Sequence, residues 1–264
     1  MELKAKILYN DRLAEGYFRL GLSCGMAEVR AGHFVMLKVS NGLDPLLRRP
    51  LGIYRPLGAK GKGAGVELLY RVVGRGTGIL SLKRPGETLG VLGPLGNGFA
   101  DPPEDRKIVM LAGGMGIVPL YMLAKKARGA TLLFGARTKK ETFLLKDFRA
   151  MGLKIKTATE DGSAGTKGFV TELLASGITP ETTVYACGPV GMLKAAAMIT
   201  NKAGAKCLVS LERSMACGIG VCLGCAVRTR ARHEEKENRF YKMVCSDGPV
   251  FNSLDIDWDR FDER

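Results

Sequence analysis

The sequence predicts an antiparallel β-barrel, then a five-stranded parallel, doubly wound α/β domain, and last a small C-terminal domain. Three observations support this order: short apolar runs between turn residues up to residue 100, alternating strand and helix patterns over 101–211, and a glycine- and cysteine-rich segment within 212–264. With 264 residues, the chain has room for about two domains with full cores. The last segment is too short to build a core alone and would need a metal.

The first hundred residues have the pattern of a barrel. Glycine and proline divide them into short apolar runs, a spacing typical of all-β barrels or sandwiches. The polar, proline-bearing segment Asp101–Arg106 predicts the first domain boundary. The predicted strands are Lys4–Tyr9, Tyr17–Leu22, His33–Val39, Gly65–Val73 and Thr88–Leu92.

From residue 107 onward, apolar strand patterns alternate with helical patterns. The helical patterns are clearest at Pro119–Ala127 and Val190–Lys202. Such alternation predicts a parallel sheet with helices on its faces. The predicted strands are Ile108–Leu111, Thr131–Phe134, Lys154–Ala158, Thr183–Ala186 and Cys207–Leu211.

The chain is strongly basic, with a net charge of +14. This charge favours anionic partners such as nucleic acid or phosphate-bearing cofactors, although a solvated basic surface is the more common explanation. We expect no nucleic-acid binding, because the basic residues of the first domain form no dense cluster and the C-terminal tail is acidic. We also expect no secretory signal and no membrane span. Because we expect no secretory signal, the seven cysteines favour metal binding or redox chemistry over disulfides, and we expect a cytoplasmic protein.

Four cysteines give the strongest chemical signal. Their spacing, C-x4-C-x2-C followed by a fourth cysteine, is that of plant-type 2Fe–2S proteins. The intervening glycines permit the backbone conformations that bring three thiolates of one loop onto two irons. Structural zinc is the alternative, although zinc requires neither this triplet nor its glycines. The predicted ligands are Cys217, Cys222, Cys225 and Cys245.

Two glycine-containing loops follow predicted strands of the α/β domain. Gly113, Gly114 and Gly116 follow its first strand, and Gly188 and Pro189 follow its fourth. Because ligands of open α/β sheets bind at the carboxyl ends of the strands, we expect both loops to face one crevice and to bind a pyrophosphate. Glycines required only for tight packing are the alternative.

Arginines stand beside glycines and an aromatic residue in the first domain, at 48–52, 69–71 and 74–78. The arginine fork suits a pyrophosphate, and a tyrosine can stack on a ring. Surface arginines next to hairpin turns explain the spacing equally well.

Taken together, these motifs resemble the electron-transfer subunits of the two-component (class 1B) dihydroorotate dehydrogenases, which belong to the ferredoxin–NADP reductase superfamily. The resemblance covers nearly the whole chain, and the cysteine segment is its most specific part. The motifs are Arg49–Gly52, Leu69–Arg71, Gly76-Thr77, Gly113–Pro119, Thr159–Ser163, Cys187–Pro189, Cys217–Cys225 and Cys245–Phe251.

The resemblance implies FAD in the barrel, NAD on the α/β domain and the cluster facing a partner. The implied FAD residues are Arg49, Pro50, Leu51, Gly52, Leu69, Tyr70, Arg71, Gly76 and Thr77. The implied NAD residues are Gly113, Gly114, Gly116, Gly188 and Pro189, with Cys187 near the nicotinamide. Gly52 departs from the family, whose members usually carry a serine there near the flavin N5.

The resemblance also implies a reaction and a partner. An FMN-containing catalytic subunit would oxidise dihydroorotate in pyrimidine biosynthesis, and electrons would pass through the 2Fe–2S cluster and FAD to NAD⁺. The implied assembly is a heterotetramer of two of each subunit. The chain itself offers no base for dihydroorotate oxidation, since we interpret His33 and His233 as structural or surface residues.

Three alternatives remain at this point. One is the FAD/2Fe–2S subunit of another NAD(P)H-linked complex, of the ferredoxin:NADP oxidoreductase or sulfite reductase type. The others are a basic nucleic-acid-binding protein and a zinc-stabilised scaffold. The residues alone do not decide between NAD and NADP, because Arg137 after the second strand could meet a 2′-phosphate or solvent.

Overall fold

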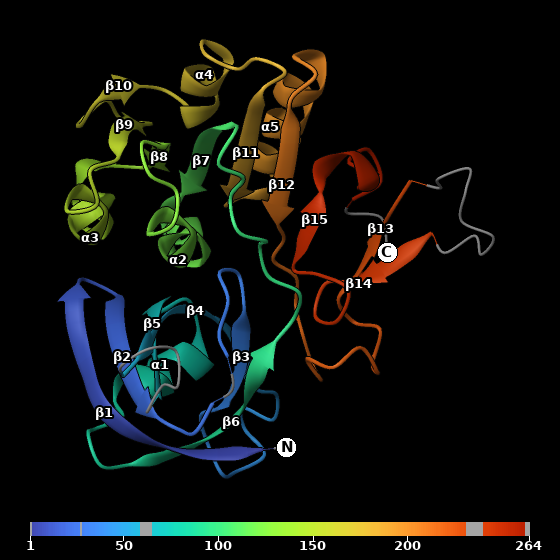
Figure 1. The fold of residues 1–264 in the computed structure, drawn as a ribbon. Coiled ribbons are helices and arrows are strands. Elements are labelled where there is room, and N and C mark those ends of the chain that lie inside the picture. The colour runs from blue at the N-terminus through green and yellow to red at the C-terminus, as the bar shows by residue number, and fades with distance from the viewer. Residues whose placement is uncertain (1, 27, 59–64, 231–239, 262–264) are drawn as a thin grey trace.

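The computed structural model describes residues 2–26, 28–58, 65–230 and 240–261 (Figure 1). A closed barrel lies below a sheet flanked by helices, and the C-terminal segment lies beside both (Figure 1). The predicted fold class is confirmed. His233 and most of the charged segment around it lie outside the described residues.

The barrel has six antiparallel strands in the order β1-β2-β5-β4-β3-β6. Ala5, Leu20, Val35 and Leu68 are among the fully buried residues of its core. All five predicted runs are strands, but β4 was predicted only as a binding motif. The elements are β1 (Leu3–Ala14), β2 (Tyr17–Ser23), β3 (Phe34–Lys38), β4 (Arg49–Leu57), β5 (Gly65–Arg71) and β6 (Thr88–Leu95), with helix α1 (Arg75–Ser81) between β5 and β6.

The α/β sheet has seven strands in the order β10-β9-β8-β7-β11-β12-β15, which corrects the prediction of five. The five predicted strands form its parallel centre. The two additional strands are edge strands of two and three residues, too short to show a strand pattern in the sequence. The strands are β7 (Lys107–Gly113), β8 (Thr131–Ala136), β9 (Lys154–Thr159), β10 (Thr166–Lys167), β11 (Thr182–Cys187), β12 (Lys206–Ser210) and β15 (Val250–Asn252).

One predicted helix is confirmed and another differs. Helix α5 spans the predicted Val190–Lys202. The helix predicted at 119–127 is instead a 3₁₀ segment followed by a single α-turn, because the glycine-rich sequence before Pro119 favours tight turns over a regular helix. The remaining elements are η1 (Gly114–Leu120), α2 (Tyr121–Ala124), η2 (Lys139–Leu145), α3 (Lys146–Arg149) and α4 (Val170–Ala175).

The C-terminal segment shares its core with the α/β sheet. It contains β13 (Ala226–Arg228), β14 (Tyr241–Met243), β15 and η3 (Ser253–Asp255). Its buried residues Val227, Val244 and Trp258 belong to the same apolar cluster as the residues under α5. Strand β15 pairs antiparallel with β12, so the segment extends the sheet rather than standing apart from it.

Side chains of α2 and α3 join the barrel to the α/β domain. Tyr54 packs on Tyr121 with ring centroids 4.1 Å apart, and its hydroxyl donates to Asp147 at 2.9 Å. Arg19 reaches the same carboxylate at 3.2 Å. These contacts set the spacing of the two domains and therefore the shape of the space between them.

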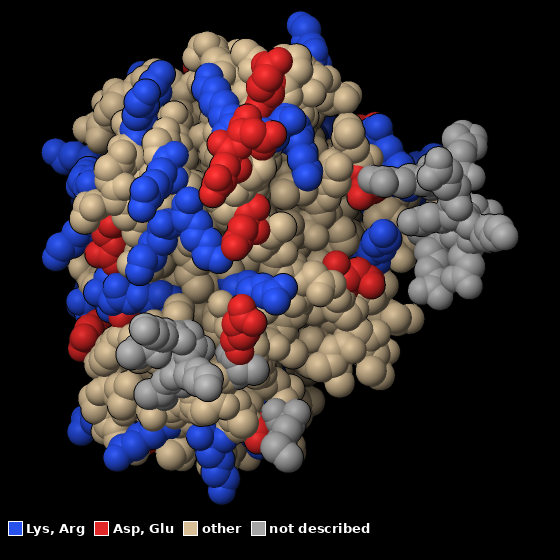
Figure 2. All heavy atoms as spheres, in the orientation of Figure 1, with Lys and Arg blue, Asp and Glu red and all other residues tan. Residues whose placement is uncertain are grey.

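The visible face mixes charges of both signs. Figure 2 shows many Lys and Arg side chains with Asp and Glu side chains between them, so the net charge is spread over this face as interleaved charges. Among the described helices, none combines the length and apolarity needed to span a bilayer.

Candidate functional site

A cavity of about 1050 Å³ lies between the barrel and the carboxyl ends of the parallel strands. Its size suits a large ligand, since typical ligand pockets hold roughly 300–1,000 Å³. Twelve of the predicted residues line it, which brings the barrel motifs and both glycine loops to one place. They are Pro50, Leu51, Gly52, Leu69, Tyr70, Arg71, Gly113, Gly114, Gly116, Cys187, Gly188 and Pro189.

Three predicted FAD residues, Arg49, Gly76 and Thr77, are not among the described residues that line the cavity. A Cβ on Gly76 would lie 2.2 Å from Arg49 Nε, so the arginine crosses directly over this glycine. The hydroxyl oxygen of Thr77 accepts a hydrogen bond from the N–H of Val73 at 3.0 Å, which shapes the turn before α1. Arg49 therefore packs against the first turn of α1, whose shape is stabilised by the Thr77 hydroxyl.

The predicted glycine loops pack backbone against backbone. A Cβ on Gly116 would lie 2.1 Å from the carbonyl oxygen of Cys187, and one on Gly188 would lie 3.0 Å from Gly113 Cα. Gly188 also has a φ of +154°, which side chains rarely adopt. The two loops therefore pack closely and line one cavity, as expected, and pyrophosphate binding by them stays a prediction.

Gly52 has space for a side chain. A Cβ there would meet only Val118 Cγ1, at an ordinary contact distance of 3.5 Å. The departure from the serine of the family is thus not imposed by crowding.

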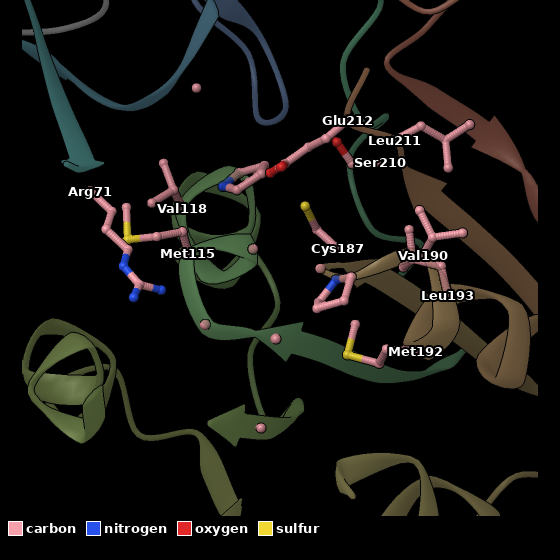
Figure 3. A pocket seen from close by; sticks show the side chains of 18 of the residues that line it. Arg71, Met115, Val118, Cys187, Val190, Met192, Leu193, Ser210, Leu211 and Glu212 are labelled. Atoms are coloured by element: carbon pink, nitrogen blue, oxygen red, sulfur yellow. The ribbon is translucent and has the colours of Figure 1, made fainter. Parts of the chain in front are cut away.

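Sequence reasoning missed two polar groups beside Cys187. Figure 3 shows Cys187, Ser210 and Glu212 on one side of the cavity, with Arg71 and Met115 across from them. Cys187 is 1% exposed, and burial raises the pKa of its thiol so that it stays protonated. Desolvation also raises the pKa of Glu212. The sequence carries no local signal for them, because only the pairing of β12 with β11 brings Ser210 beside Cys187.

The histidines supply no base to this cavity within the described residues. His33 Nδ1 accepts a hydrogen bond from the backbone N–H of Arg30 at 3.1 Å, in the turn before β3. Burial lowers the pKa of His33, which fits a neutral acceptor. The predicted structural role of His33 is therefore supported.

The cysteine loop lies against the barrel next to this cavity. A Cβ on Gly218 would lie 2.6 Å from Met36 Cγ in β3, whose first residue, Phe34, lines the cavity. Gly218 and Gly220 have φ values of +76° and +81°, so the loop adopts the conformations for which its glycines were predicted.

The cysteines of this loop fit a cluster held by thiolates. Cys225 and Cys245 are buried with their Sγ atoms 3.2 Å apart, and the N–H of Gly220 donates to Cys245 Sγ at 3.1 Å. Although desolvation acts to raise it, N–H groups of Ile219 and Cys222 hold the pKa of Cys217 at about 6. N–H donors to sulfur are the interactions that tune an iron–sulfur centre.

The fourth cysteine, Cys222, is exposed. No three cysteine, histidine or carboxylate side chains converge into a ready-made metal site in the described parts of the chain. The assignment of the four ligands therefore depends on their spacing, the loop glycines and the N–H donors.

Two family models match the chain, one in the α/β domain and one in the cysteine-bearing C-terminal segment. Residues 110–198 match an oxidoreductase NAD-binding domain, and residues 212–257 match the iron–sulfur cluster binding domain of dihydroorotate dehydrogenase B. Over its whole length the chain resembles the solved structure of an NADH-dependent reduced ferredoxin–NADP oxidoreductase, with a TM-score of 0.79, 28% identity, and coverage of 97% of this chain and 91% of that one. The fold and the site thus define an NAD-linked, iron–sulfur oxidoreductase subunit of the ferredoxin reductase type.

Curated relatives give the particular family. The chain is 38% identical over 250 residues to the dihydroorotate dehydrogenase B (NAD(+)) electron transfer subunit of Caldanaerobacter subterraneus subsp. tengcongensis, covering 95% of this chain and 96% of the relative. It is 41% identical over 259 residues to the same subunit of Geobacillus sp. strain WCH70, with the same coverage. The chain belongs to this family of electron transfer subunits. The resemblance drawn from the motifs and the expected cofactors, 2Fe–2S, FAD and NAD, are confirmed.

Proposed function

We propose that this chain passes electrons from a dihydroorotate-oxidising catalytic subunit to NAD⁺. The observation that carries the proposal is the meeting of three features: barrel motifs, two glycine loops on one cavity, and the cysteine loop against the adjoining strand β3. When bound, the cluster would carry electrons one at a time, and FAD would collect two of them with a proton and transfer a hydride to NAD⁺. The protein supplies binding, orientation and a fixed spacing for these groups.

The FAD site comprises the cavity-lining residues of β4 and β5 and the neighbouring first turn of α1. Tyr70 and Arg71 end β5 on the cavity, while Pro50, Leu51 and Gly52 come from the neighbouring strand β4. Leu69 contributes apolar surface. Arg49 places its guanidinium beside Gly76 and Thr77 in the first turn of α1, an arrangement suited to a pyrophosphate.

The NAD site comprises the two packed loops. Gly113, Gly114 and Gly116 leave backbone close to the cavity, and Gly188 and Pro189 begin α5 on the same side. Burial raises the pKa of the Cys187 thiol, so this residue presents a small neutral side chain to the nicotinamide ring. Cys217, Cys222, Cys225 and Cys245 hold the cluster.

The catalytic subunit docks over the cysteine loop. Ile219, Val221 and Leu223 are 56%, 74% and 63% exposed there, around the exposed Cys222. Exposed apolar side chains at one place mark association sites. A partner seated here brings its own redox centre next to the cluster, and two such pairs form the proposed heterotetramer. Thiolate ligands require a reducing compartment, which supports a cytoplasmic location.

The visible absorption spectrum of anaerobically purified protein tests the proposal. We expect flavin bands over broader iron–sulfur absorption, and bleaching of both on addition of NADH. Dihydroorotate should bleach the spectrum only when the catalytic subunit is also present. A colourless, zinc-containing protein would contradict the cofactor assignment, and bleaching by NADPH in preference to NADH would favour another NAD(P)H-linked complex.

Replacing Arg49 by alanine is expected to weaken FAD binding by about tenfold or more. The substitution removes a charge-assisted contact worth roughly 1.5–3 kcal/mol from the phosphate edge. Equilibrium titration of flavin-depleted protein with FAD measures the change. Arg12→Ala, at an exposed position of β1, is the matched control and should leave FAD affinity unchanged. Full flavin retention by the Arg49 variant would remove this residue from the site.

A further inference from the structure

One carboxylate connects the two sides of the cavity. Glu141 lies in the first turn of η2, and its side chain is 14% exposed. Its Oε1 accepts a hydrogen bond from the Tyr17 hydroxyl of β2, and its Oε2 accepts one from the backbone N–H of Arg137 at 3.0 Å. Desolvation and the bond to Glu141 raise the pKa of Tyr17 to about 12, so the hydroxyl remains a donor at neutral pH.

On the barrel side, Glu141 reaches an arginine of the proposed FAD site. Arg71 Nη1 lies 4.0 Å from Glu141 Oε1, and Arg71 Cζ lies 5.4 Å from the centre of the Tyr17 ring. Tyr17 and Arg71 are directly paired across β2 and β5, so their backbones are fixed by the sheet. Figure 3 shows Arg71 beside Met115 at the cavity wall. Glu141 and Tyr17 therefore restrict where this long side chain can place its guanidinium.

On the α/β side, Glu141 reaches the position where a dinucleotide ribose is expected. Arg137 directly follows β8 and lines the cavity, about twenty residues beyond the first glycine loop, where α/β domains place their ribose-binding residue. The neighbouring N–H of Lys139 donates to Ser163 Oγ at 2.7 Å. The short segment 137–141 thus reaches Arg71 of the proposed FAD site at one end and the expected ribose position at the other.

We propose that Glu141 couples these sites, so that FAD and NAD⁺ each bind more tightly when the other is present. This inference rests on the proposed function. The Arg71 side chain is 44% exposed, so fixing its guanidinium beside Glu141 costs conformational freedom. Binding of the first nucleotide includes this entropic cost. The second nucleotide then binds a protein whose Arg71 side chain is already ordered, which produces positive cooperativity. Linkage makes the effect reciprocal. Glu141 is a positioning residue, since it acts through Arg71, Tyr17 and the backbone of Arg137.

Asp147 provides a matched control. It lies six residues further on in α3 and also joins the α/β domain to the barrel, through Arg19 at 3.2 Å and the Tyr54 hydroxyl at 2.9 Å. Unlike Glu141, it is not part of the cavity wall formed by the described residues. Asp147→Ala and Glu141→Ala therefore each remove one carboxylate between the domains, but only the second removes a connection between nucleotide sites.

The test measures the FAD dissociation constant of the full chain with and without saturating NAD⁺, with no reductant present. For the unsubstituted protein we expect NAD⁺ to lower this constant by at least about 5-fold, the lower end of typical couplings. Glu141→Ala should bring the ratio close to one, and Asp147→Ala should leave it unchanged. Tyr17→Phe, which keeps the carboxylate but removes its donor, should reduce the ratio. Thermal melting verifies that each variant is folded.

Each other outcome has a defined meaning. A ratio of one in the unsubstituted protein, or an unchanged ratio in Glu141→Ala, overturns the inference. An equal decrease of the ratio in Asp147→Ala also overturns the inference, because the coupling would then depend on any contact between the two domains and not on Glu141. If Glu141→Ala does not fold, an unchanged ratio in Tyr17→Phe overturns it instead. If the unsubstituted protein does not bind FAD at all, the proposed function itself is contradicted. This result differs from every outcome that overturns only the inference.

Discussion

Replacing Cys245 by serine is expected to remove the 2Fe–2S cluster while FAD remains bound. Cys245 Sγ is buried beside Cys225 Sγ and accepts the N–H of Gly220, so its loss removes a ligand at the enclosed end of the site. A serine hydroxyl is a poor replacement for a thiolate on iron. The barrel motifs lie on other elements, so the flavin should be retained. Iron and acid-labile sulfide per chain, measured beside the flavin absorbance, give the result.

Cys24→Ser is the matched control for this substitution. Cys24 is also buried, but it belongs to the barrel core and burial alone raises the pKa of its thiol. This variant should keep its full iron content. Equal iron in both variants would exclude Cys245 as a ligand, and loss of flavin together with iron would mean that the cluster loop also supports the barrel.

Replacing Gly116 by alanine is expected to lower NAD⁺ affinity by at least tenfold and to destabilise the protein. The new Cβ would lie 2.1 Å from the carbonyl oxygen of Cys187, where backbone cannot move aside cheaply. Forcing extra volume into packed structure costs about 1–3 kcal/mol, and the two loops that form the proposed NAD site would separate. Titration with NAD⁺ and thermal melting measure the two effects.

Gly191→Ala separates this effect from a general sensitivity of the cavity. Gly191 lines the same cavity within α5, but a Cβ there meets no atom within 4 Å. Alanine is also the better helix former, so stability should be kept or slightly raised. Unchanged NAD⁺ binding by Gly116→Ala would show that the packing of the loops is irrelevant to the nucleotide.

The parts of the site that the sequence revealed are those with a local signal. The spacing from Cys217 to Cys225 and the glycines after Leu111 are visible in a few consecutive residues, and the structure brings the predicted loops to one cavity. Five of the six barrel strands were equally visible, because each of these five is an apolar run between turn residues. Local pattern was enough wherever one short segment carries the chemistry.

The remaining parts depend on contacts between distant segments. Glu141 sits in an ordinary charged stretch, and only the fold places it against Tyr17, 124 residues away. Ser210 and Glu212 acquire meaning from the neighbouring strand β11. Strand β15 has three residues and exists because β12 offers a free edge. Such features have no periodicity of their own from which they could be predicted.

The pairing of β15 with β12 has a consequence for how electrons move. Because the cysteine-bearing segment continues the sheet on one side and rests on Met36 of the barrel on the other, it is clamped at two points. A carrier that swings on a tether must diffuse between donor and acceptor, and its turnover slows as the solvent becomes more viscous. A cluster segment that is fixed at two points does not have to move between donor and acceptor. Internal transfer through this subunit should therefore be indifferent to added glycerol, leaving the exchange of small molecules as the step that solvent friction can affect.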